Sequence, residues 1–304
     1  MDLLDPLESL MVTAEFVSSP MHVAALIILS PPPGEECRAY VKQIYEDTLT
    51  AAVEIDRRLR RVPHSGVDTG FMWVWRDIAD TGAALDIRHH FQRRTLPKGA
   101  GPAALWEMVS DLHALRLERS EPLWMAYLID GLPDGRFAFY IKVHHTVVDG
   151  VAGLQMITGS LSTDPDARGM PPFYAAAVPA PGPERTTGRR VPGPLTVLRG
   201  IAGAASAGVE LTGKVLRTQL TAALGAALTD SIVTPFSAPQ TRFNAKLGPY
   251  RAVAGTSLDR ARIRALQQAG GVTGNDVMMT IIATALRTWL AEHGELPDRS
   301  LVAI

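Results

Sequence analysis

His144-His145-Thr146-Val147-Val148-Asp149-Gly150 joins a predicted strand to a predicted helix. The strand covers residues 136–144, and successive side chains of a strand point to opposite sides, so we expect the rings of His144 and His145 to face opposite ways. An imidazole has an unperturbed pKa near neutrality and can take a proton from an alcohol at physiological pH. We therefore expect one ring to face a cavity and the other to support it by packing or hydrogen bonding.

Asp149 and Gly150 complete the motif. Asp149 is placed to orient the loop by pairing with an arginine, or to hold an imidazole in one tautomer. Gly150 permits backbone angles that other residues disfavour. A metal site is the alternative for paired histidines, but no HExxH sequence or cysteine cluster supplies further ligands, so we expect none. The second pair, His89-His90, lacks a following Asp-Gly and is interpreted as a partly exposed segment.

Strands and helices are expected on both sides of the motif. Residues 131–135, Gly-Leu-Pro-Asp-Gly, lie between two predicted strands and are a hairpin signal. Strands are predicted at residues 21–30, 71–75, 124–130, 136–144 and 250–258. Helices are predicted from apolar spacing or cap residues at 35–56, 102–117, 150–161, 258–269 and 273–293.

The composition excludes several classes of protein. The 304 residues suggest about two domains, and 46% hydrophobic residues suffice for a full-sized core. Lys+Arg 30 against Asp+Glu 31 leaves a net charge of -1, which argues against a nucleic-acid partner. The single cysteine, Cys37, rules out an intramolecular disulfide and suits a reducing compartment. The first residues lack the cationic region typical of a secretory signal.

A change of composition at residue 163 indicates a boundary. Residues 165–194 are rich in proline and glycine, which is typical of a loop or linker. Residues 201–228 form an apolar stretch that Glu210, Lys214 and Arg217 make too polar for the centre of a bilayer. Two interpretations of this stretch stay open: a helix packed between two domains, and an amphipathic helix lying on a membrane surface.

The motif at 144–150 resembles the His-His-x-x-x-Asp-Gly motif of coenzyme A-dependent acyltransferases. That superfamily includes chloramphenicol acetyltransferase-like enzymes and the condensation domains of peptide synthetases. The flanking segments narrow the resemblance to the bacterial wax ester synthase/diacylglycerol acyltransferase family. The similar segments are Pro122-Leu123-Trp124, Asp5-Pro6-Leu7-Glu8, Pro20-Met21-His22-Val23, residues 85–90 with Leu96-Pro97, and Asn275-Asp276-Val277 with Ala285-Leu286-Arg287 and Gly294-Glu295-Leu296-Pro297.

The resemblance implies an α/β fold of the α+β type, similar to chloramphenicol acetyltransferase, with two domains of mixed sheets flanked by helices and a tunnel between them. It divides the chain into an N-terminal domain at residues 1–163, a linker with a helical crossover at 164–240, and the start of a C-terminal domain at 241–304. Family members continue well past Ile304. We therefore expect the second domain to be incomplete, and a longer product or a partner chain to supply the rest.

The resemblance also implies O-acyl transfer from a long-chain acyl-coenzyme A to diacylglycerol or a long-chain alcohol. Acyl-coenzyme A is a co-substrate, and no cofactor is expected. His145 matches the general base, which takes the hydroxyl proton of the acceptor so that the alcohol attacks the thioester directly. His144 and Asp149 match supporting positions, Asp149 through an arginine, and Gly150 allows the turn.

Five further residues match substrate-binding segments of the family. Pro122, Leu123 and Trp124 either line the acyl chain or pack in the core. Asn275 and Asp276 match a pair near the cleft, with a helix-cap role as the alternative.

Two other functions stay open: a truncated, non-catalytic remnant that binds lipid or acyl-coenzyme A, and a condensation domain of the peptide-synthetase type, which needs carrier-protein partners. We expect a cytoplasmic location. Because the substrates are lipids, the membrane's inner face or a lipid droplet is the expected surface for peripheral association.

Overall fold

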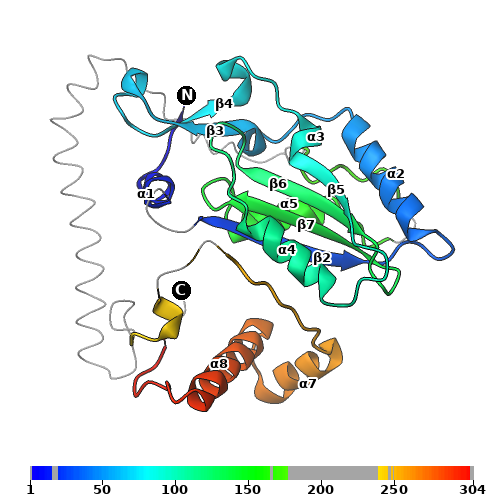
Figure 1. The fold of residues 1–304 in the computed structure, drawn as a ribbon, viewed down its shortest axis with the longest axis vertical. Helices are drawn as coiled ribbons and strands as arrows, with labels where there is room; N and C mark the ends of the chain where they lie inside the picture. The colour runs from blue at the N-terminus through cyan, green and yellow to red at the C-terminus, as the bar shows by residue number, and fades with distance from the viewer. Residues whose placement is uncertain are drawn as a thin grey trace. The chain divides into compact units, whose positions relative to one another are not determined.

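The computed structural model describes residues 2–15, 20–164, 167–176, 239–245, 248 and 250–301. These residues fall into two units: the first contains both β-sheets, and the second contains helices α7 and α8 (Figure 1). The stretch 201–228 and most of the predicted linker lie outside the described residues, so the domain boundaries stay predictions. In the described part of the chain, no helix is long and apolar enough to cross a membrane.

The larger sheet has four strands in the order β2-β7-β6-β5. Strands β6 (Trp124–Asp130) and β7 (Phe137–His144) form its centre, close to the predicted ranges. They are antiparallel because the connecting loop turns at Gly131 and Gly135, whose φ angles of 85° and 75° lie in the left-handed region that favours glycine. The outer strands are β2 (His22–Leu29), antiparallel to β7, and β5 (Phe91–Thr95), parallel to β6.

Helices cover both faces of this sheet (Figure 1). Helices α2 (Cys37–Thr50) and α5 (Gly150–Gly159) pack on one face, and α4 (Ala104–Ala114), which connects the parallel strands β5 and β6, packs on the other. The apolar residues of β7 alternate accordingly. Phe137 and Ile141 belong to the first core, on the side of α2 and α5, and Ala138 and Tyr140 belong to the second core, on the side of α4. Each fully buried valine or leucine side chain contributes about 1.5–3 kcal/mol to such a core.

The smaller sheet has the order β1-β4-β3, with β1 (Asp2–Leu3), β3 (Arg61–His64) and β4 (Val74–Asp77). Helix α1 (Pro6–Ala14) follows β1 and begins with a capping box between Asp5 and Glu8. The remaining short elements are the four-residue helix α3 (Ile87–His90) and 3-10 helices at Arg57–Arg60, Val67–Thr69 and Ile78–Thr81.

Two predicted strands were wrong. The strand predicted at 71–75 begins only at Val74, because Phe71 has a left-handed φ of 61° and its carbonyl accepts a 2.9 Å hydrogen bond from the Ser65 hydroxyl. Residues 250–258 form no strand, since the Val253 amide donates to the Ser110 hydroxyl at 2.8 Å instead of to a neighbouring strand.

The helix predicted at 35–56 was too long at its C-terminal end. It stops at Thr50 because the next residues form extended contacts with a segment distant in sequence, including an Ile55–Ala175 bridge. The Asp56 amide donates to the Tyr174 carbonyl at 2.8 Å, and Phe173 and Tyr174 are buried in the first core. Part of the predicted linker therefore packs into the N-terminal unit.

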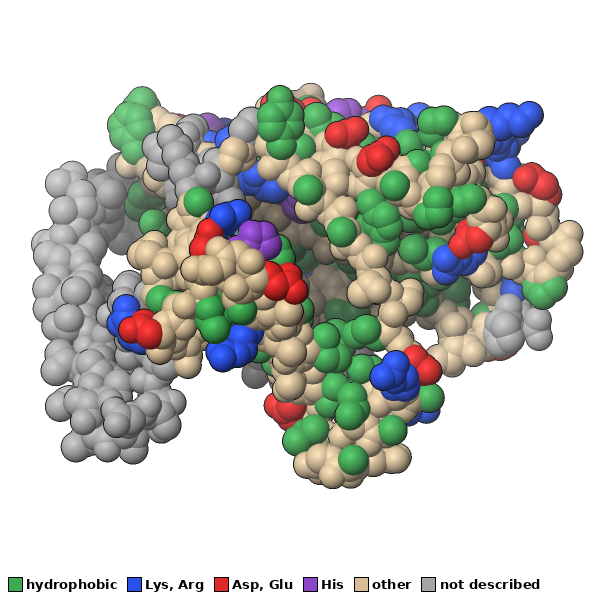
Figure 2. All heavy atoms as spheres, turned by 60° about the horizontal axis from the view of Figure 1, so that its bottom comes forward, with side chains coloured by type: hydrophobic (Ala, Val, Ile, Leu, Met, Phe, Trp, Pro, Cys, Tyr) green, Lys and Arg blue, Asp and Glu red, His purple; other side chains and the backbone are tan. Residues whose placement is uncertain are grey.

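The second unit contains helices α7 (Arg260–Gly270) and α8 (Gly274–Glu292) and a 3-10 helix at Arg242–Asn244. Both long helices lie within a few residues of their predicted bounds. Their surface carries many hydrophobic side chains (Figure 2, green), among them Leu266, Met278, Met279 and Ile282.

Candidate functional site

The two rings of the histidine pair lie in opposite environments at the end of β7. His144 is 1% exposed, whereas His145 is exposed. Strand β7 ends at His144 because the chain turns there, with the Val147 amide donating to the His144 carbonyl at 2.9 Å. The backbone of the pair is fixed on both sides: the His144 amide donates to the Leu123 carbonyl and the His145 amide to the Met21 carbonyl, each at 2.9 Å.

The buried ring of His144 lies between Thr146 and Glu15. Its Nδ1 accepts a 3.2 Å hydrogen bond from the Thr146 amide and lies 2.8 Å from the Thr146 hydroxyl. Its Nε2 lies 3.7 Å from Oε2 of Glu15. Burial by itself would raise the pKa of the Glu15 carboxyl, but His144, the Met21 amide and Arg119 together lower that pKa to about 2. Glu15 is therefore a charged group next to the His144 ring.

Asp149 caps the helix that follows the pair. Its Oδ1 accepts a 2.7 Å hydrogen bond from the Ala152 amide, which satisfies a free donor of the first turn of α5. No arginine forms an ion pair with Asp149 in the described part of the chain, so the expected pairing stays a prediction, and Arg58 is paired with another carboxylate. The guanidinium of Arg58 donates hydrogen bonds to Asp56 at 2.7 Å and 3.0 Å. These bonds are the main cause that raises the pKa of Arg58, and the negative charges of Asp56 and Asp149 raise it further. The hydrogen bond of Asp149 therefore goes to the helix, and Arg58 is held by Asp56.

Gly150 does not use the backbone freedom that the motif suggested for it. It is the first residue of α5, its φ lies outside the left-handed region, and a Cβ there would meet no atom within 4 Å. The turn is made instead by residues 145–147.

Pro122, Leu123 and Trp124 are all buried in the unit that carries the histidine pair. Trp124 is 0% exposed, and its indole Nε1 donates to the Leu59 carbonyl at 2.9 Å. Leu123 provides the carbonyl that fixes the His144 amide. Of the two roles left open for this segment, the packing role accounts for these contacts.

The second histidine pair is more buried than expected on one side. His89 is exposed, but His90 is 1% exposed, stacks on Trp124 at 4.7 Å and donates from Nδ1 to the Trp124 carbonyl at 2.8 Å. Burial is the main cause that lowers the pKa of His90, and the charge of the neighbouring His89 lowers it further. His90 is therefore a neutral histidine of the core.

Sequence reasoning missed Glu15 and did not connect His22 with the site. His22 lies opposite His144 in the pairing of β2 with β7, and Glu15 lies just before β2 in the chain. If the predicted strands 21–30 and 136–144 had been paired antiparallel, His22 would have been placed opposite His144. No local sequence pattern marks Glu15.

Asn275 and Asp276 belong to the second unit. Asp276 forms a capping box with Thr273 at the start of α8, and hydrogen bonds from the Thr273 hydroxyl and amide lower the Asp276 pKa. Asn275 is exposed. The cap role, which the sequence left as an alternative, therefore describes Asp276.

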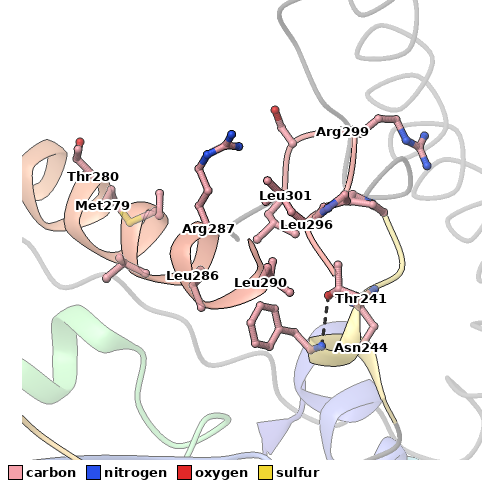
Figure 3. A pocket seen from close by; sticks show the side chains of 16 residues that line it. Thr241, Asn244, Met279, Thr280, Leu286, Arg287, Leu290, Leu296, Arg299 and Leu301 are labelled. Carbon is pink, nitrogen blue, oxygen red and sulfur yellow. Dashed lines mark hydrogen bonds between the residues drawn. The ribbon is translucent and has the colours of Figure 1, made fainter. Parts of the chain in front are cut away.

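An apolar cavity of about 690 Å³ lies in the second unit, between α8, the segment with the 3-10 helix at Arg242–Asn244, and residues 296–301 (Figure 3). Its walls include Met279, Leu286, Leu290, Leu296 and Leu301, and the side chains of Arg287 and Arg299 stand near its edge. The cavity shares no residue with the histidine pair.

Comparisons with known proteins agree on one family. The family described as wax ester synthase/diacylglycerol acyltransferase catalytic domain matches residues 4–278. A putative diacylglycerol O-acyltransferase of Mycobacterium tuberculosis H37Rv is 34% identical over 297 residues, which cover 98% of this chain and 57% of the relative. A second one from that strain, called a probable diacylglycerol O-acyltransferase, is 33% identical and is covered to 63%.

The fold resembles a solved structure, a wax ester synthase/diacylglycerol acyltransferase from Marinobacter aquaeolei VT8. The TM-score is 0.69 at 31% sequence identity, over 98% of this chain and 62% of that chain. The chain therefore spans less than two thirds of the length of these relatives.

Proposed function

Because the chain belongs to the wax ester synthase/diacylglycerol acyltransferase family, we propose that it transfers the acyl group of a long-chain acyl-coenzyme A to diacylglycerol or a long-chain alcohol. The observation that carries the proposal is the contrast between the two histidines of the motif. A general base has to reach a substrate hydroxyl, and the exposed ring of His145 is accessible, whereas the ring of His144 is 1% exposed.

In the proposed reaction, a ring nitrogen of His145 accepts the hydroxyl proton as the alcohol oxygen bonds to the thioester carbon. The carbon–sulfur bond then breaks, and His145 returns the proton to the coenzyme A thiolate. The products are an ester and free coenzyme A, and no acyl-enzyme forms. General-base catalysis of this kind contributes about 10²–10⁴-fold to a rate.

The test measures thiol release from a long-chain acyl-coenzyme A, with diacylglycerol or a long-chain alcohol as the acceptor. His145→Ala is expected to lower the rate by about 10²–10⁴-fold. The matched control is His89→Ala, which removes another exposed histidine that lies outside the motif. Unchanged turnover in His145→Ala would contradict the proposed role of this ring.

Because the chain spans 57% of the first Mycobacterium tuberculosis relative, the assay is run twice. The first run uses the chain alone, and the second adds the C-terminal part of that relative as a separate chain. Turnover in either run supports the proposal. Acyl-coenzyme A binding without turnover in both runs would instead favour the non-catalytic interpretation.

We also propose that the protein associates peripherally with lipid surfaces, because both the acyl donor and the acceptor are lipids. Flotation with liposomes that contain diacylglycerol checks this. Protein that stays entirely in the dense fractions would contradict it.

A further inference from the structure

Glu15 is a buried carboxylate that accepts two hydrogen bonds in the described part of the chain, from Met21 and Arg119. It is 7% exposed. Its Oε1 accepts from the Met21 amide at 3.0 Å, and its Oε2 accepts from Nη2 of Arg119 at 3.1 Å. A buried carboxylate is tolerated only when it is paired and hydrogen-bonded, and these two donors meet that requirement.

The contact between Glu15 and His144 has a defined direction. A backbone amide can only donate, so the hydrogen bond from the Thr146 amide makes Nδ1 of His144 an acceptor. The neutral ring therefore carries its proton on Nε2. That atom has no hydrogen-bond partner in the described part of the chain, and the nearest carboxylate oxygen is Oε2 of Glu15, at 3.7 Å. At this distance the interaction is between the carboxylate charge and the N–H dipole rather than a full hydrogen bond.

Glu15 also reaches His145, through the backbone. The Met21 amide donates to Glu15, and the Met21 carbonyl accepts the His145 amide at 2.9 Å. One carboxylate therefore holds the ring of the first histidine through its charge and the main chain of the second through a single intervening residue.

We infer that Glu15 is a positioning residue for the histidine pair: it fixes the ring of His144 and, through Met21, the backbone that presents His145. The inference rests on the proposed function, because it assigns a purpose to the arrangement around the proposed base. Glu15 acts through the two histidines and is not itself a catalytic residue. A misplacement of about 1 Å at a reacting group can lower a rate by about 10²-fold, so the loss of this support has a measurable effect.

The first test compares Glu15→Gln with wild type. Glutamine keeps the size and an oxygen acceptor for the Met21 amide, but it removes the charge. We expect kcat to fall by about 10–100-fold while KM for acyl-coenzyme A changes by less than about twofold. The control is Glu118→Gln, which removes an exposed carboxylate next to Arg119 in the sequence, and which we expect to leave kcat unchanged.

The second test does not depend on turnover. The chain has eight histidines, so labelling with ¹⁵N-histidine gives a spectrum that single His→Gln variants can assign. We expect the Nε2-protonated tautomer of His144 in wild type, and a shift of the His144 ring nitrogens in Glu15→Gln but not in Glu118→Gln. If Glu15→Gln does not fold, Glu15→Asp, which keeps the charge but withdraws it by one methylene group, is measured in both ways.

The outcomes separate the two proposals. A wild-type chain without turnover, alone or with the added C-terminal part, contradicts the proposed function, and the spectrum still tests the contact. An active wild type with unchanged kcat and unchanged His144 signals in the Glu15 variants overturns the inference alone.

Discussion

His22 lies directly opposite His144 in the antiparallel pair of β2 and β7. Its Nε2 donates to the His113 carbonyl at 2.8 Å, and its Nδ1 is buried without a hydrogen-bond partner in the described part of the chain. Burial is the largest cause that lowers the pKa of His22, to about 4, and the positive charge of Lys142 acts in the same direction. The face of the sheet that carries the His144 ring therefore holds a second histidine in its neutral form.

This lowered pKa predicts a pH-dependent stability. The unfolded chain binds a proton at His22 near pH 6.5, whereas the folded chain does so only near 4. The free energy of unfolding therefore falls as the pH drops from 6.5 to 4, by up to roughly 3 kcal/mol. His22→Gln keeps an N–H donor but does not titrate, so we expect urea unfolding at about pH 7 and about pH 5 to show a smaller difference than in wild type. An equal difference in His22→Gln and in wild type would contradict this account.

Substitutions in the histidine pair should separate activity from stability. His145→Ala removes an exposed ring, so we expect turnover to be lost while the free energy of unfolding changes by less than about 0.5 kcal/mol. His144→Ala removes a buried ring and its contacts with Thr146, so we expect a loss of about 1–3 kcal/mol as well as of activity. Urea unfolding and thiol release measure the two effects. Equal destabilisation by both substitutions would contradict the difference in burial.

The cap formed by Asp149 gives a third prediction. Asp149→Ala removes the acceptor for the Ala152 amide, and the expected cost is about 1 kcal/mol. Asp149→Ser keeps a capping oxygen but removes the charge near Arg58. We expect the serine variant to recover most of the stability and the activity. A stable serine variant without turnover would show that the charge, and not the cap, is what the site needs.

The loop between β6 and β7 provides a matched pair of glycines. Both have a left-handed φ, so alanine is strained at either position. A Cβ on Gly131 would in addition lie 3.1 Å from the Leu96 carbonyl oxygen, whereas a Cβ on Gly135 would meet nothing within 4 Å. We expect Gly135→Ala to cost about 1–2 kcal/mol and Gly131→Ala clearly more, as measured by urea unfolding. A larger loss for Gly135→Ala would contradict this account of the loop.

The elements that the sequence predicted well are those with local signals. Strands β6 and β7 are nearly continuous apolar runs joined by a loop with glycines, and α8 begins at a Thr273 cap, so their bounds agree with prediction to within one residue at these points. The end of α2 depends on the distant residues 171–176, and the Phe71 turn depends on hydrogen bonds that no periodicity records.

The same distinction applies to the site. The alternation of a strand predicted different environments for His144 and His145, but only His144 belongs to β7, and His145 is exposed in the turn that follows. The role of Glu15 was not predictable, because its contacts with Arg119 and His144 join segments that are far apart in sequence and that only the folded chain brings together.

The packing of Phe173 and Tyr174 has a practical consequence for protein engineering. Phe173 lies edge-on to Trp124 at 5.5 Å, and the Ala176 amide donates to the Glu54 carbonyl at 2.7 Å. A gene shortened to encode the sheet-containing unit by itself would have to extend through codon 176. Ending it where the amino-acid composition changes, near residue 163, would leave a hydrophobic hollow beside the tryptophan and favour aggregation during expression.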